Sequence, residues 1–142
     1  MFSGEFEHTI DEKGRLTIPA KFRAELADGV FITRGLDGCL FVYPIAEWKA
    51  LAKKLVKLPL AQRNARYFNR MMFSGADCKP DKQGRILLPA PLREHAAIES
   101  DVVVIGLNSR LEIWSKERWR EVPARIEKES AAFAEQLSEL GI

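Results

Sequence analysis

Two short segments of this chain carry a carboxylate and a guanidinium four residues apart, with a glycine directly before the arginine. Asp11 and Arg15 form the first pair, and Asp81 and Arg85 form the second. An arginine offers a rigid planar fork that can bond a guanine edge in two places or clamp a phosphate. The same spacing suits a salt bridge that ties the ends of a hairpin together. From these residues alone, nucleic-acid contact and a structural salt bridge are equally well supported.

The two carboxylates are predicted to orient the arginines rather than to touch nucleic acid. Phosphate repels a carboxylate, whereas a carboxylate that accepts hydrogen bonds from turn amides or from the guanidinium fixes the arginine and reduces the entropy lost on binding. A lysine lies beside each pair and adds positive charge. The predicted site therefore consists of Asp11, Lys13, Arg15, Asp81, Lys82 and Arg85.

Other chemistry finds little support in the sequence. Cys39 and Cys78 are the only cysteines, and neither has a Cys or His at the close spacing of zinc or redox motifs, so we expect no metal and no cofactor. A nucleophile elbow, a phosphate loop and a metal-binding helix motif are all missing, which argues against an enzyme. Apolar stretches fall well short of the roughly 20 residues of a membrane span, and no signal-like segment opens the chain. We expect a cytoplasmic protein.

The paired segments belong to a longer internal repeat. Residues 11–23 recur as residues 81–93, with the Asp, Gly, Arg, Pro, Ala and final Arg coinciding, and the match continues to Trp48 and Trp119. In the first unit the pattern predicts a strand over 6–10, a turn over 11–14 with a hairpin partner strand after it, a helix from Pro19 to Gly29, and a hairpin of strands over 30–33 and 39–43. The second unit repeats this, with strands over 102–105 and 111–114.

Alternation along the strand after the turn gives the predicted hairpin two faces. Leu16 and Ile18 are expected to face the core, with Arg15 and Thr17 on the outer face. Leu87 occupies the position of Thr17 in the second unit, which suggests burial in a half-domain or subunit contact. The three tryptophans are expected in the core. Arg23 and Arg93, which also coincide in the repeat, are expected to pair with nearby acids, with a phosphate contact as the alternative.

Two helical segments follow the units. An apolar stripe from Trp48 to Val56 predicts an amphipathic helix, and after Pro59 a second helix carries arginines for which a solvated face or a subunit contact is expected. The net charge is only +2, but residues 53–85 are basic and the chain's end is acidic, so a positive surface able to meet phosphates is predicted. A weaker apolar stripe after Pro123 is expected to dock on the body of the protein or on a neighbour.

A unit of roughly 50 residues buries too little surface to be stable alone, so the two halves are expected to share one core. The predicted fold class is α+β, mainly β, with a pseudo-twofold barrel flanked by helices. The predicted division of the chain is unit one over 5–50, a helical connector over 51–72, unit two over 73–120 and a helical tail over 121–142.

Together with Met1-Phe2-x-Gly4-Glu5 and Thr33-Arg34-Gly35-Leu36-Asp37, the repeated motif resembles the MraZ family over nearly the whole chain. The resemblance implies two tandem AbrB-like swapped-hairpin units, a ring-shaped homo-oligomer, and a sequence-specific transcriptional regulator, with repression the expected direction. It implies double-stranded DNA with short direct repeats as the partner, the promoter of the division and cell-wall gene cluster that includes its own gene as the target, and the nucleoid as the place of action. The DNA-reading role then falls on Arg15 and Arg85.

The two copies of the motif differ, and a rival function stays open. Pro80 stands where the first unit has Ile10, and Gln83 replaces Lys13. Because proline cannot donate a ladder hydrogen bond, the second hairpin is expected to fray or bend before its turn and to bind DNA more weakly. The alternative function is an AbrB-fold protein-interaction module, such as an antitoxin-like partner.

Overall fold

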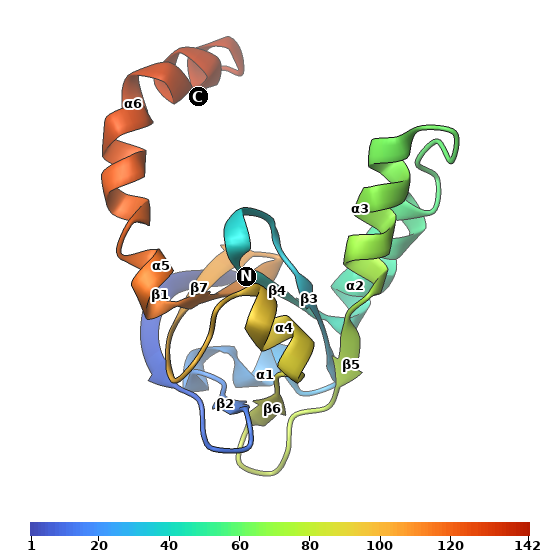
Figure 1. The fold of residues 1–142 in the computed structure, drawn as a ribbon, viewed down its shortest axis with the longest axis vertical. Coiled ribbons are helices and arrows are strands. Elements are labelled where there is room, and N and C mark those ends of the chain that lie inside the picture. Colours follow the sequence, from blue (N-terminus) through green and yellow to red (C-terminus); the bar gives the residue numbers. More distant parts are fainter.

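The strands of the chain form two antiparallel sheets (Figure 1). In the computed structural model, which describes residues 1–142, the strands are β1 (Phe2–Thr9), β2 (Arg15–Thr17), β3 (Val30–Arg34), β4 (Leu40–Pro44), β5 (Ala76–Cys78), β6 (Arg85–Leu87), β7 (Asp101–Asn108) and β8 (Arg110–Ser115). Six of them form a sheet in the order β1-β7-β8-β4-β3-β5, and β2 pairs with β6 in a separate ribbon. The predicted α+β class is confirmed. The predicted barrel is not, because the larger sheet is open, with β1 and β5 at its edges.

Short helices connect the strands, and longer ones extend from the body. They are η1 (Ala20–Phe22), α1 (Arg23–Leu26), η2 (Leu36–Gly38), α2 (Ile45–Leu55), α3 (Arg63–Phe73), α4 (Ala90–His95), α5 (Lys116–Trp119) and α6 (Val122–Glu139). The helix predicted after Pro19 is present as η1 and α1, and the β3–β4 and β7–β8 hairpins are confirmed. The stripe predicted through Val56 ends one residue early. Val56 caps α2 and is 68% exposed, because the chain turns away there toward Pro59.

Each half of the chain supplies strands to the other half. β1 pairs along its whole length with β7, and β5 pairs with β3, so the first strand of each unit lies beside the third strand of the other. The hairpin predicted across the first turn is reduced to a single bridge between Ile10 and Leu16. The reason is that the eight residues of β1 find eight partners on β7, whereas β2 has only three residues to offer.

The halves share one apolar core, as predicted. Leu16 and Ile18 of the first unit pack in the same cluster as Ile86 and Leu88 of the second, and all four are at most 1% exposed. A second, largely aromatic cluster joins the sheet to α2 and α3, with the rings of Phe31 and Trp48 stacked at 3.8 Å. Burying both halves in one core fixes β2 against β6, and this places the two turns together.

The longer helices project from the end of the body opposite the two turns (Figure 1). α2 and α3 run together as one arm, and α5 leads into α6 as the other. α6 has no buried residue, so it does not dock on the body of its own chain, and Pro123 lies in its first turn rather than interrupting it. None of the helices combines the length and the apolar character that crossing a bilayer requires.

Candidate nucleic-acid interface

The turn after β1 is closed by backbone hydrogen bonds between its ends. The amide of Asp11 donates to the Arg15 carbonyl at 3.0 Å, and the amide of Gly14 donates to the Asp11 carbonyl at 3.0 Å. Gly14 has a φ of 80°, a conformation that side chains with a Cβ rarely adopt. The turn from Asp81 to Arg85 repeats both bonds, at 3.0 and 2.9 Å. The sequence repeat is therefore also a repeat of geometry.

One carboxylate organises each turn. Oδ1 of Asp11 accepts hydrogen bonds from the amides of Lys13 and Arg15 at 3.0 and 2.9 Å, and Oδ2 accepts from Nε of Arg15 at 2.7 Å. Asp81 does the same with the amides of Gln83 and Arg85, both at 2.9 Å, and with Nε of Arg85 at 2.7 Å. The carboxylate thus holds the backbone of the turn and the guanidinium at once.

The salt bridge occupies only the inner side of each guanidinium. Nε of Arg15 and Nε of Arg85 are bound, while the two terminal nitrogens of each side chain make no hydrogen bond within the chain. About 30% of the Arg15 side chain and 27% of the Arg85 side chain is exposed. The two interpretations of the motif are therefore compatible: the salt bridge exists, and the edge that bonds a guanine in two places is left free.

Both carboxylates are held in their charged form. The amide of Arg15 that bonds to Asp11 lowers the pKa of that carboxyl below its ordinary value, and the side chain of Arg15 adds to the effect. The pKa of Asp81 is lowered in the same way by the amide of Arg85. At neutral pH each arginine therefore keeps a charged partner that fixes its direction.

The turns are tied to each other across the two halves. The carbonyl of Gly84 accepts a hydrogen bond from the amide of Ile18 at 2.8 Å, and the carbonyl of Gly14 accepts from the amide of Leu88 at 2.9 Å. Each turn is thus fastened to the strand end of the other unit. The arginines therefore have a fixed distance and orientation relative to each other, as a rigid recognition surface requires.

Arg23 and Arg93 brace this arrangement, and the prediction that they pair with acids is wrong. Nε of Arg23 donates to the Ile18 carbonyl at 3.1 Å, and Nε of Arg93 donates to the Leu88 carbonyl at 2.9 Å. Each side chain also lies against the glycine of the opposite turn, where an added Cβ would come within 2.7 to 2.8 Å of it. The carbonyls at the strand ends need donors more than the exposed acids do. Sequence reasoning missed this bracing, although the arginines recur in register with the glycines.

The outer face of the β2–β6 ribbon carries both arginines. Arg15 lies opposite Leu87, and Thr17 lies opposite Arg85, while the residues between them face the core. The predicted two faces are confirmed. Leu87 is not buried in a half-domain contact, because its side of the ribbon has no layer over it and it is 50% exposed.

All six predicted site residues lie at one end of the molecule. Figure 1 shows the two turns beside each other beyond β2 and β6, on the side away from the helical arms. Lys13 and Lys82 are exposed in these turns, and their side chains make no hydrogen bond within the chain. The end of the molecule that carries the repeat therefore presents two guanidinium edges and two free ammonium groups.

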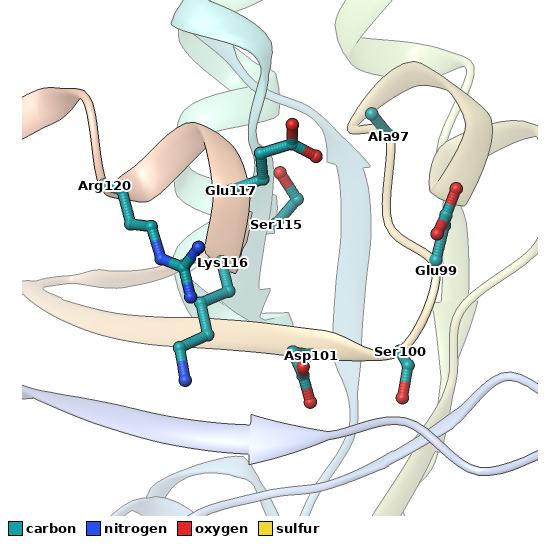
Figure 2. A pocket seen from close by; sticks show the side chains of 8 residues that line it. All are labelled: Ala97, Glu99, Ser100, Asp101, Ser115, Lys116, Glu117 and Arg120. Carbon is teal, nitrogen blue, oxygen red and sulfur yellow. The ribbon is translucent and has the colours of Figure 1, made fainter.

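A hollow of the surface lies away from the two turns, where β7 begins beside α5 (Figure 2). It has a volume of about 270 Å³ and is lined mainly by polar and charged residues, among them Glu99, Asp101, Lys116 and Arg120. Their side chains do not converge on one point, and Lys116 is already engaged with Glu7 at 3.6 Å. The chain has no group of three or more His, Cys, Asp or Glu placed to hold a metal ion. The hollow has no arrangement typical of a catalytic centre.

Known proteins match this chain along its whole length. The model of the family described as "MraZ protein, putative antitoxin-like" matches residues 1–71 and again residues 72–139. The transcriptional regulator MraZ of Thermoanaerobacter pseudethanolicus is 54% identical over 143 residues, which cover 100% of both chains. Proteins of the same name from Heliobacterium modesticaldum and Clostridium acetobutylicum are 54% and 52% identical, over 96% and 100% of both chains. The two matched segments correspond to the two halves that share the core.

Proposed function

The chain belongs to the MraZ family, and on that premise we propose that it is a sequence-specific DNA-binding transcriptional regulator that reads the duplex with its paired turns. One observation carries the proposal: the terminal guanidinium edges of Arg15 and Arg85 are unpaired, while their inner nitrogens are held by Asp11 and Asp81. An arginine held in this way is preorganised for a bidentate hydrogen bond to O6 and N7 of guanine, so its side chain loses little conformational entropy on binding.

The shape of the ribbon fits the same role. A two-stranded antiparallel ribbon is one of the elements that the major groove admits, with the side chains of its outer face directed at the base edges. The ribbon here carries an arginine on each strand, at diagonal positions of that face. Lys13 and Lys82, in the turns beyond it, are placed to contact phosphates and to hold the register without reading sequence.

The helical arms support the proposal that the protein acts as a ring-shaped homo-oligomer. The α2–α3 arm is basic, with exposed lysines and arginines at Lys53, Lys54, Lys57, Arg63 and Arg70. α6 is acidic, with Glu127, Glu129, Glu135 and Glu139, and its apolar stripe is left uncovered, with Ile126 52% exposed. Opposite charges and uncovered apolar residues on two different surfaces suit a head-to-tail contact between copies, and such contacts form a ring when the rotation from copy to copy closes.

A ring of such copies fits an operator made of short repeats. One ribbon makes few contacts, but linked ribbons bind one after another within the same complex, so avidity can exceed single-unit affinity by roughly 10²–10⁴. Direct repeats about 10 base pairs apart would present themselves on one face of the duplex. The family resemblance points to the promoter of the division and cell-wall gene cluster, the chain's own gene included, and to the nucleoid. It also supports describing residues 5–50 and 73–120 as AbrB-like swapped-hairpin units, in keeping with the exchanged strands.

The test is a mobility-shift titration with the DNA upstream of the chain's own gene. Arg15→Ala and Arg85→Ala should each weaken binding, and the natural protein should bind scrambled DNA far less tightly. Arg120→Ala is the matched control, because it removes the same charge from an exposed position on α5's side of the molecule. Unchanged affinity in both ribbon variants would contradict the proposed site.

The oligomer has its own test in light scattering. Ile126→Asp places a charge on the apolar stripe of α6 and should dissociate the ring, whereas Ala131→Asp adds the same charge off the stripe and should leave it intact. Inserting about five base pairs between DNA repeats should weaken binding severely, and inserting a full turn should partly restore it. A dissociated variant that binds repeat arrays with full affinity would contradict the oligomeric mechanism.

The alternative of an antitoxin-like interaction module is favoured by one observation, the uncovered apolar stripe of α6. In that case α6 would bind a different protein rather than a second copy of this chain. Copurification of a stoichiometric partner with the natural protein but not with Ile126→Asp, together with no specific DNA shift, would favour this alternative.

A further inference from the structure

On the outer face of the ribbon, the two copies of the repeat differ in chemical character as well as in residue type. The pairs across the strands are Arg15 with Leu87 and Arg85 with Thr17. Side chains directly opposite each other in an antiparallel pair have Cβ atoms roughly 4.5–5.5 Å apart. One arginine therefore has a bare apolar neighbour, and the other has a hydroxyl with a single methyl group.

The fold does not require an apolar residue at position 87. Ile86 supplies the buried side chain of β6, and Leu87 points the other way and is 50% exposed. The first unit forms the equivalent strand with Thr17. Most of the other exposed large apolar residues lie on the helical arms, in their connections or at the chain ends. Leu87 instead lies on the outer face of the ribbon, directly opposite Arg15.

We propose that Leu87 is a specificity-determining residue that contacts the 5-methyl group of a thymine next to the guanine read by Arg15. The inference rests on the proposed function. In the major groove guanine offers two acceptors to an arginine, and thymine alone offers a methyl group to an apolar side chain. An arginine and a leucine side by side match that pair of neighbours, whereas Arg85 and Thr17 make a less apolar surface.

As a consequence, the ribbon would bind its DNA site in one orientation only. Two identical halves would bind a site equally well in either orientation, because the twofold axis exchanges them. With Leu87 on one side and Thr17 on the other, only one orientation places the apolar side chain on the thymine methyl. Each copy in an oligomer would then have to face the same way along the duplex to make the same contacts.

The experiment replaces thymines by deoxyuridine, one at a time, in the duplex used for the mobility shift, since this removes only the methyl group. For the natural protein one such replacement in each repeat should weaken binding about three- to fivefold, the effect of one buried methyl group. Leu87→Ser should bind the thymine duplex more weakly by a similar factor and should no longer distinguish the two duplexes. Thr17→Ser is the matched control and should keep the discrimination.

Circular dichroism checks that both variants fold. Equal binding of the thymine and deoxyuridine duplexes by the natural protein, or discrimination that persists in Leu87→Ser, overturns the assignment of Leu87 while leaving the DNA-binding function in place. Failure of the natural protein to shift any duplex specifically overturns the proposed function itself and this inference with it.

Discussion

The turn from Asp11 to Arg15 and the turn from Asp81 to Arg85 make the same hydrogen bonds, although their second and third residues differ. Lys13 and Gln83 both contribute only a backbone amide to the carboxylate. The conformation of the turn therefore depends on some of its positions and not on others. The aspartate, the glycine and the arginine are needed for the bonds, whereas the two positions between them are free to vary in charge.

The strands that lead into the two turns differ more than the turns do. β1 has eight residues and β5 only three. Ile10 still donates its amide to the Ser100 carbonyl at 2.9 Å, and Pro80 at the equivalent position has no amide to donate. The prediction that the second hairpin frays before its turn fits this short strand. The turn itself is undistorted, because its own hydrogen bonds are local and its attachment to the other unit is the bond from the Ile18 amide to the Gly84 carbonyl.

The largest effect is expected from removing both arginines. Each bidentate base contact is worth roughly 1–3 kcal/mol, so Arg15→Ala combined with Arg85→Ala should abolish specific binding while the duplex is still bound weakly through phosphates. Of the single variants, Arg85→Ala is expected to be the milder, since the shorter β5 leaves the second turn less firmly attached at its entrance. Titration of the three variants against one operator fragment measures the difference. Equal losses in the single variants would mean that the entering strand is irrelevant to recognition.

The next effect concerns stability and should be the same in both copies. Gly14→Ala and Gly84→Ala impose a Cβ on φ values of 80° and 74° and push it against Arg93 and Arg23. The strain of the left-handed backbone costs roughly 1–2 kcal/mol per residue, and displacing a bracing arginine adds to it. Urea unfolding should show both losses. Gly141→Ala is the control, since its φ is 77° but nothing lies within 4 Å of the added atom. If only one of the two glycine variants loses free energy of unfolding by this amount, the two turns are not equivalent.

The sequence allowed the prediction of what is local. Alternation placed Leu16 inward and Arg15 outward, the glycine marked the turn, and the carboxylate was expected to accept from turn amides and the guanidinium, as it does. These features depend on neighbours within about five residues. The same locality explains why the β3–β4 hairpin was predicted to within one residue of its observed bounds. The β7–β8 hairpin was also predicted, but β7 extends three residues beyond the predicted strand.

What the sequence did not allow was the choice of partners across the halves. The exchange of β1 and β5 between units and the contact of Arg23 with Gly84 join residues that are about 45 to 105 positions apart in the sequence. Nothing in a strand's own alternation says which other strand it will pair with. The predicted barrel failed for this reason, since closure depends on pairings that the local pattern leaves undetermined. The exposure of Leu87 likewise depends on what covers the ribbon, which the strand itself does not specify.

A smaller effect is expected from the carboxylates, and its pH dependence follows from their lowered pKa. A group whose pKa is lower in the folded state than its ordinary value of 3.8 stabilises the fold above that value, and the contribution is lost as the pH falls through the folded pKa. The natural protein should therefore lose stability below about pH 4 more steeply than the Asp11→Asn, Asp81→Asn double variant. At pH 7 the variant should bind DNA more weakly, because its guanidinium groups are no longer held by a charge. Urea unfolding from pH 7 to pH 2.5 checks the first point. If the free energy of unfolding falls with pH at the same slope in the two proteins, the expectation is contradicted.

The smallest effect should come from the lysines, where the two copies differ in position but not in kind. Lys13 is the third residue of its turn and Lys82 is the second of the other, so the two ammonium groups do not obey the symmetry that relates the arginines. A phosphate contact carries no sequence information, and it neutralises one backbone charge wherever it falls. Lys13→Ala and Lys82→Ala should each weaken binding to operator DNA and to scrambled DNA by the same small factor. Each should also lower the slope of log affinity against log salt concentration by about 1. The arginine variants, in contrast, should change the preference for the operator. If Lys13→Ala instead reduces discrimination between operator and scrambled DNA, this lysine reads a base, and the first turn contributes more to specificity than the second.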